Sequence, residues 1–142
     1  MKANDFVRLA LESPFHIFMG NMMLITVTGR RTGRRITTPV NYVREGDTLW
    51  IISRRSRRWW RNIEASPAVQ LRLHGKEVPA TAELVLDEKS VASGVGVYVR
   101  NLPMAARALR VKLDNGVPNA LDLEHAAKEH LLVKVCIQNA VI

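Results

Sequence analysis

Two short clusters of arginine are the residues of this sequence best suited to binding a ligand. The first lies within residues 30–35 and the second within residues 54–61. Residues 29–61 carry all of the formal net charge of +8, because acidic and basic side chains balance in the rest of the chain. The arginine guanidinium pairs with phosphate or carboxylate through parallel hydrogen bonds and stays charged at any physiological pH. The clusters therefore indicate an anionic partner, and a merely solvated surface is the alternative.

Both clusters lie where a ligand could be held. Gly29 and Gly33 allow a tight basic turn, after which Thr37 and Thr38 place hydroxyls on opposite faces of a strand. The second cluster leaves a strand and enters a helix, whose first N–H groups favour anions. The adjacent Trp59 and Trp60 offer a flat surface for a ring, although we expect at least one of them to be a core aromatic.

Conventional catalytic sets are sparse. His125 and His130 are five residues apart, which is not the spacing that places two metal ligands on one helix face, so we expect no metal site. Cys136 lies in an apolar strand and is expected to be a small core residue. We find no nucleophile elbow, P-loop or dinucleotide motif. A chain with binding groups but no evident acid, base or nucleophile is typical of an enzyme whose cofactor supplies the chemistry.

Six strands and several helices are expected to position these groups. The strands are predicted over residues 22–28, 35–44, 48–53, 68–74, 78–86 and 131–138. The helices are predicted from Asn4 or Asp5, over 57–65 after a Ser56 cap, from Asp87 towards Lys112, and over 121–130. Gly94, Gly96 and Pro103 are expected to interrupt the third of these helices.

The connections between the strands decide the fold class. They are too short for the crossover helices of a parallel sheet, so the sheet should be antiparallel. Closure into a small barrel would hide its edges. A length of 142 residues predicts one domain, 1–142. A single cysteine and the lack of a long apolar stretch make the cytoplasm the expected compartment.

A resemblance to a known family rests on residues 24–53, which read LITVTGRRTGRRITTPVNYVREGDTLWIIS. A tryptophan, Asn62 and the sequence Ala-Ser-Pro-Ala-Val (residues 65–69) follow. This segment resembles the deazaflavin-dependent nitroreductases and quinone reductases. The resemblance implies an α+β fold, a six-stranded antiparallel split β-barrel of the FMN-binding type with flanking helices. It covers residues 20–85 and is weak in the C-terminal third.

The resemblance also implies a cofactor, coenzyme F-420, whose tail carries phosphate. Carried over by position, the groups that would bind this tail are Arg30, Arg31, Arg35, Thr37 and Thr38. Those that would line the ring or close the groove are Pro39, Val40, Ser53, Arg54 and Trp59 or Trp60. The loop after Ser53-Arg54 is shorter than in similar proteins and has no glycine, so FMN or another anionic ligand is an alternative.

The leading hypothesis is a reductase that transfers hydride from a bound deazaflavin or flavin to a hydrophobic quinone or nitro compound. Tyr42, Tyr98 or a backbone amide would donate a hydrogen bond to the acceptor. The apolar segment with Phe15, Phe18, Met19, Met22 and Met23 is expected to pack on the barrel; covering the acceptor or touching a membrane surface are alternatives. A homodimer is a further expectation from the resemblance.

Two rival functions use the same residues. A nucleic-acid-binding barrel would place the arginines on phosphates and stack Trp59 or Trp60 on a base. A barrel that binds a flavin or deazaflavin without catalysing a reaction is the other rival. The physiological acceptor is not predicted from the sequence.

Overall fold

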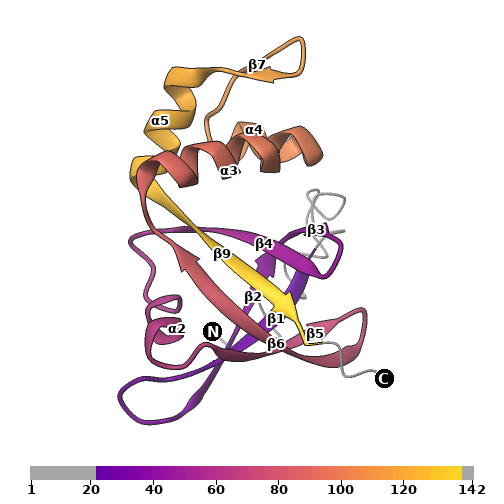
Figure 1. Ribbon diagram of the computed structural model, residues 1–142, viewed down its shortest axis with the longest axis vertical. Helices are drawn as coiled ribbons and strands as arrows, with labels where there is room; N and C mark the ends of the chain where they lie inside the picture. Colours follow the sequence, from indigo (N-terminus) through magenta and orange to yellow (C-terminus); the bar gives the residue numbers. More distant parts are fainter. Residues whose placement is uncertain (1–21, 139–142) are drawn as a thin grey trace.

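The computed structural model describes residues 22–138, in which a curled sheet carries a layer of helices on one side (Figure 1). The strands are β1 (Met22–Thr28), β2 (Arg35–Asn41), β3 (Val43–Glu45), β4 (Thr48–Arg54), β5 (Ala68–Leu73), β6 (Lys76–Val85), β7 (Leu113–Asp114), β8 (Val117–Pro118) and β9 (His130–Ile137). The helices are α2 (Arg61–Ala65), α3 (Glu88–Asn101), α4 (Met104–Ala108) and α5 (Ala120–Glu129). The predicted helix near Asn4 and the residues Phe15, Phe18 and Met19 lie outside the described part of the chain.

The main sheet is antiparallel, as predicted, and its order is β2-β1-β5-β6-β9-β4-β3. The strands at its two ends, β2 and β3, are successive parts of one segment that is interrupted only at Tyr42. The segment pairs with β1 up to Asn41 and with β4 from Val43 onward. The sheet therefore curls until its two ends meet. The strand predicted over 35–44 is thus divided into β2 and β3, which is why the main sheet has seven strands where six were predicted.

Strand β4 packs on both faces: one face is buried in the barrel and the other is partly buried under the helices. Leu49 and Ile51 point into the barrel and belong to its main core cluster. Trp50 and Ile52 point outward and pack in the clusters that the helices form on the sheet. The alternation in β4 thus joins the barrel to the helical layer, where α3, α4 and α5 lie together in Figure 1.

Helix α3 begins where the sequence predicted but is not interrupted at its glycines. The Asp87 carboxylate accepts a hydrogen bond from the Ser90 N–H at 2.9 Å and caps the helix. At Gly94 the helix lies so close to β9 that an added Cβ would overlap the Leu132 Cδ1. Gly94 is therefore a position of close packing and not a break in the helix.

Two other predictions from the sequence are wrong. The helix expected over 57–65 begins at Arg61, and Trp60, not Ser56, occupies its N-terminal cap position without a side-chain hydrogen bond. Residues 55–60 form turns and bends instead. Cys136 is exposed and not part of the core, because it alternates with the buried Val135 and faces outward from β9.

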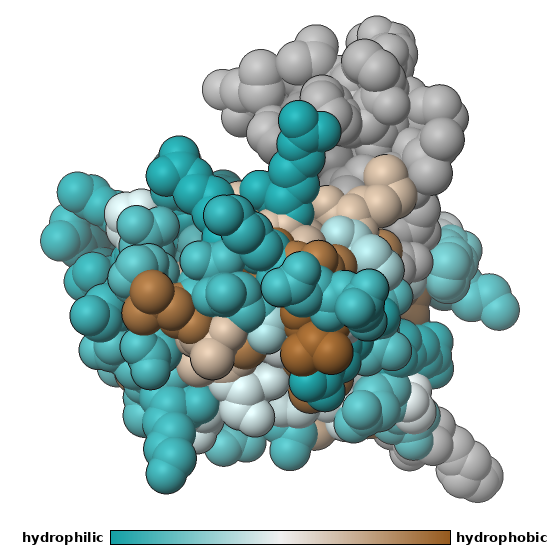
Figure 2. All heavy atoms as spheres, turned by 90° about the horizontal axis from the view of Figure 1, so that it is seen from above, coloured by the Kyte–Doolittle hydropathy of each residue, from teal (hydrophilic) through white to brown (hydrophobic). Residues whose placement is uncertain are grey.

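The outer face of the helical layer is mostly hydrophilic, with separate apolar spots (Figure 2). The large exposed apolar residues of these elements are Val97, Met104, Val117 and Leu121. Scattered apolar side chains of this kind are normal on a protein surface. Among residues 22–138, no helix has the length and apolar character needed to cross a bilayer.

The close approach of α3 to β9 leads to a prediction about Gly94→Ala. The new methyl group would collide with the side chain of Leu132, which is 2% exposed and has little room to move. We expect the free energy of unfolding, measured in urea, to fall by about 1 to 3 kcal/mol.

Gly96→Ala is the matched control, since its Cβ would lie at an ordinary 3.4 Å from Leu123 Cδ1. This variant should be neutral or more stable by up to about 1 kcal/mol, because alanine is the better helix former. Equal unfolding free energies for the two variants would contradict the packing role of Gly94.

Candidate functional site

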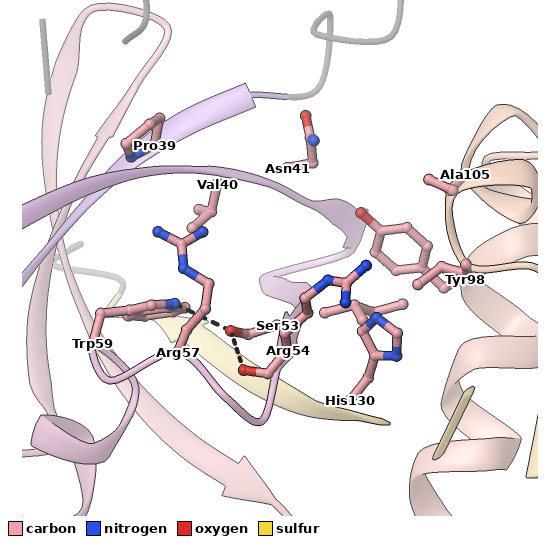
Figure 3. A pocket seen from close by; sticks show the side chains of 13 residues that line it. Pro39, Val40, Asn41, Ser53, Arg54, Arg57, Trp59, Tyr98, Ala105 and His130 are labelled. Atoms are coloured by element: carbon pink, nitrogen blue, oxygen red, sulfur yellow. Dashed lines mark hydrogen bonds between the residues drawn. The ribbon is translucent and has the colours of Figure 1, made fainter. Parts of the chain in front are cut away.

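A cavity of about 330 Å³ opens where the two ends of the sheet meet (Figure 3). Strand β2 supplies one wall through Pro39, Val40 and Asn41, and the helices α3 and α4 supply the opposite wall, with Tyr98 and Ala105. The end of β4, the residues after it and His130 complete the lining. The volume lies in the range of small-molecule sites in proteins.

The floor of the cavity is rigid because its polar groups are hydrogen-bonded to one another. The Trp59 indole N–H donates to the Ser53 hydroxyl at 3.2 Å, and that hydroxyl donates to the Arg54 carbonyl at 3.3 Å. Trp59 is only 7% exposed, so the part of its ring that reaches the cavity is held in the core. This arrangement offers a fixed apolar surface to a flat ligand.

Other polar atoms at the cavity have no partner within the described residues. The Asn41 Oδ1 is buried and accepts no hydrogen bond. Arg54 and Arg57 are exposed at the mouth, and neither is close enough to a carboxylate to form an ion pair; the ion pair that residues 22–138 do form joins Arg72 to Glu77. Asn41 thus holds an unpaired but enclosed acceptor beside the cavity, and Arg54 and Arg57 present two free cations at its mouth.

The two tyrosines that the sequence offered as hydrogen-bond donors have different positions. Tyr98 lines the cavity, and burial raises its pKa to about 12. Its hydroxyl therefore keeps its proton and remains a donor at any physiological pH. Burial also raises the pKa of Tyr42, against a smaller lowering by Arg44, but Tyr42 belongs to the barrel core and does not line this cavity.

His130 is a cavity residue that the sequence analysis did not select. It is 6% exposed and lies opposite Arg54 in the pairing of β9 with β4. Its Nδ1 lies 2.9 Å from the Ala126 carbonyl, which can only accept, so Nδ1 carries the hydrogen. Only the pairing of β4 with β9 brings this residue to the cavity, and no local sequence signal predicts that pairing. The described residues contain no cluster of three metal-binding side chains.

A second, shallower depression of about 680 Å³ lies beside the β1–β2 turn. We call it the basic groove. Its lining residues are Gly29, Arg30, Arg31, Thr32, Ile36, Ser56, Arg58, Arg61 and Asn62. It contains four arginines and no acidic side chain, so it is suited to an anion. The two arginine clusters thus do meet in space, although only part of each contributes.

Asn62 joins the two basic connections. Its Oδ1 accepts from the Arg30 backbone N–H at 3.0 Å and from the Arg30 Nη1 at 3.2 Å, while its Nδ2 donates to the Trp59 carbonyl at 3.0 Å. Asn62 is 4% exposed, so these bonds are protected from water. The carboxamide therefore fixes the β1–β2 turn against the segment that follows β4.

Arg55 belongs to the second cluster but has a structural role. Its guanidinium donates to the Leu86 carbonyl at 2.6 Å and to the Ala127 carbonyl at 3.0 and 3.3 Å. Its backbone N–H also donates to the Glu129 carbonyl at 2.9 Å. Arg55 thus connects the barrel to the residues just before α3 and to the end of α5, and its Nε and Nη2 donors are already used.

The residues selected from the sequence divide among three places. The cavity contains Pro39, Val40, Ser53, Arg54, Trp59 and Tyr98. The basic groove contains Arg30 and Arg31. The others lie elsewhere: Thr38, Tyr42 and Trp60 are buried, Thr37 exchanges a hydrogen bond with Thr26, and Arg35 is exposed at the start of β2. The Arg61 guanidinium lies over Trp60, with its Cζ 5.2 Å from the centre of the indole ring. The indole N–H of Trp60 has no partner in the described part of the chain.

Comparison with known proteins adds a family and a fold. The family model described as F420H(2)-dependent quinone reductase matches residues 10–118. No curated protein matches the sequence. A solved structure described as an F420-H2 dependent reductase is 18% identical, with a TM-score of 0.56 over 84% of this chain and 95% of its own.

Two other solved structures have the same architecture. A pyridoxamine 5'-phosphate oxidase-related, FMN binding protein from Nostoc punctiforme is 11% identical, with a TM-score of 0.59 over 96% of this chain and 81% of its own. A protein described as a domain-swapped dimer is 18% identical, with a TM-score of 0.55 over 96% and 100% of the two chains. These similarities confirm the predicted α+β split barrel of the FMN-binding type.

The role of Asn62 can be tested with Asn62→Ala. The substitution leaves the Arg30 N–H without its buried acceptor, so we expect the free energy of unfolding to fall by about 1 to 3 kcal/mol in urea denaturation. Asn101→Ala is the control, because Asn101 is exposed and makes one hydrogen bond, to the Val97 carbonyl at 2.9 Å. Its effect should stay within about 0.5 kcal/mol. A neutral Asn62→Ala would show that the two connections hold together without it.

Proposed function

This chain belongs to the F420H(2)-dependent quinone reductase family, and from that premise we propose that it reduces a hydrophobic, electron-poor acceptor, a quinone or a nitro compound, in the cavity between β2 and β4. Membership of the family makes the protein an oxidoreductase that uses coenzyme F-420. The observation that supports the site is the combination of apolar walls, a buried unpaired acceptor and two unpaired arginines in one cavity.

The residues of the cavity fit a flavin-like ring with an anionic tail. Such a ring has an N–H group between two carbonyls, and the unpaired Asn41 Oδ1 is an acceptor for a group of that kind. Trp59, Pro39 and Val40 offer apolar surface to the ring faces. Arg54 and Arg57 at the mouth would hold phosphate and carboxylate groups, and the basic groove, which Ser56 and Arg58 on either side of Arg57 help to line, offers further cations. FMN has the same general chemistry and remains the alternative ligand.

The protein's own contribution is mainly binding and orientation. When bound, the reduced coenzyme supplies a hydride. The cavity walls hold the acceptor against the ring and exclude water, which accounts for much of the catalysis in reactions of this type. The Tyr98 hydroxyl, which stays protonated, donates a hydrogen bond to the acceptor oxygen as negative charge develops there.

The nucleic-acid alternative has little structural support. Trp60 is 7% exposed, belongs to the barrel core and does not line the cavity, and Trp59 is also 7% exposed and reaches the surface only inside the cavity. Neither indole therefore presents an open face on the basic surface, where a nucleic-acid strand would stack its bases. A homodimer is part of our proposal, because one protein of the same fold is described as a domain-swapped dimer.

The cavity arginines provide a first test. In the double variant Arg54→Ala, Arg57→Ala, the Kd for coenzyme F-420 should rise by about tenfold for each arginine that contacts the ligand. Isothermal titration, with FMN titrated in parallel, measures this and separates the two ligands. Arg72→Ala is the control, since Arg72 lies on the β5–β6 hairpin and pairs with Glu77. The same Kd in the double variant and wild type would exclude this cavity as the ligand site.

Tyr98→Phe tests the hydrogen-bond donor. The hydride-transfer rate should fall by about ten- to a hundredfold in stopped-flow measurements, because a donor to the developing charge is removed. The Kd of the coenzyme should be unchanged. Because the raised pKa of about 12 keeps the hydroxyl protonated, the ratio of the wild-type rate to the Tyr98→Phe rate should stay constant between pH 7 and pH 10. Tyr42→Phe is the matched comparison, and a larger kinetic effect there would reverse the assignment.

A further inference from the structure

Reduction of a quinone requires a proton as well as a hydride, and the cavity residues differ in their ability to supply it. Transfer of a hydride to a quinone gives the hydroquinone anion. Its anionic oxygen must then be protonated to give the hydroquinone. The proton has to come from water or from a side chain that faces the acceptor. A cavity that excludes water favours the side chain.

The chemistry of the lining residues leaves one candidate. Arg54 and Arg57 keep their protons at any physiological pH. The pKa of Tyr98, about 12, also holds its proton in place. The Ser53 hydroxyl is already hydrogen-bonded to Trp59 and to the Arg54 carbonyl. His130 carries the one imidazole of the lining, a group whose two nitrogens can accept a proton as well as donate one.

The orientation of His130 suits this role. The Nδ1 hydrogen is held by the Ala126 carbonyl at 2.9 Å, in the last turn of α5. The other nitrogen, Nε2, has no hydrogen-bond partner among residues 22–138. In that part of the chain the side-chain atoms that are both fully buried and unpaired are the Asn41 Oδ1 and the Trp60 Nε1. The unpaired Nε2 is not one of them, so it is not enclosed. His130 lines the cavity beside Arg54, its partner in the pairing of β9 with β4 (Figure 3).

We propose that His130 is the proton donor of the reaction: while the Ala126 carbonyl holds the hydrogen on Nδ1, Nε2 takes a proton from solvent at the cavity mouth and passes it to the acceptor oxygen. The new N–H bond at Nε2 breaks as an O–H bond forms on the reduced acceptor, and the neutral imidazole then takes the next proton from solvent. The acceptor gains the two electrons of the hydride and two hydrogens in all, which balances the reduction of a quinone to a hydroquinone. The assignment rests on the proposed function, because it takes the cavity to be the reaction site.

His130→Asn is the variant that isolates the proton. The asparagine amide can still donate to the Ala126 carbonyl in place of Nδ1, so the fold should be kept, but it has no Nε2. With duroquinone as acceptor and reduced coenzyme F-420 as donor, we expect turnover to fall by about a hundredfold and added imidazole to restore part of it. The Kd of the coenzyme, measured without acceptor, should stay within about twofold of wild type. His125→Asn, an exposed histidine on α5, is the control and should be unchanged.

A second measurement does not depend on turnover. Nitrogen-15 NMR of the histidine rings should show Nδ1 of His130 protonated in the free protein, and added duroquinol should shift its Nε2 signal while leaving His125 unaffected. Wild-type turnover in His130→Asn, or loss of turnover without rescue and without an Nε2 shift, would overturn the proposal. If the wild type reduces no quinone although duroquinol shifts His130 Nε2, the proposed function fails while the contact with His130 stands.

Discussion

The fold depends on one segment serving both ends of the sheet. Residues 35–45 pair with β1 as β2, turn at the buried Tyr42, and then pair with β4 as β3. Because the chain passes directly from one edge to the other, the barrel closes, but the strands separate around the bend. The separation is where Pro39, Val40 and Asn41 face the end of β4, and it becomes the cavity. Closure of the sheet and formation of the site therefore have the same cause.

The arginines of the two basic clusters have different roles in the structure. The sequence shows two basic clusters, but the structure assigns their members to different tasks. Arg54 and Arg57 face the cavity, Arg30, Arg31, Arg58 and Arg61 line the basic groove, and Arg55 is bound by backbone carbonyls. The Asn62 carboxamide brings the two parts of the basic groove together, because it holds the β1–β2 turn against the residues that follow β4. Charge counting alone cannot separate a binding arginine from a structural one.

The sequence predicted the strands well because alternating apolar residues and strong turn residues report on local structure. It also indicated the α+β barrel, the ring-lining Pro39 and Val40, and the importance of Ser53, Arg54 and Trp59, although the roles of these residues in binding remain predictions. Gly94 was misjudged because its local helix propensity is poor, whereas the close approach of Leu132 is a tertiary effect. His130 and Asn62 were missed for the same reason, since each acts through residues distant in the sequence. Ser56 does not cap a helix, because the residues that follow it form turns and α2 begins only at Arg61.

The anchoring of Arg55 has a kinetic consequence for the connection that contains it. Its side chain and backbone N–H donate hydrogen bonds to the carbonyls of Leu86, Ala127 and Glu129. The turn after β4 is therefore already ordered before any ligand binds. Arg54 and Arg57 thus extend from a fixed backbone, and only their side chains lose rotational freedom when an anion binds. Association then incurs a small entropic penalty and needs no loop rearrangement, which favours fast capture of a scarce ligand.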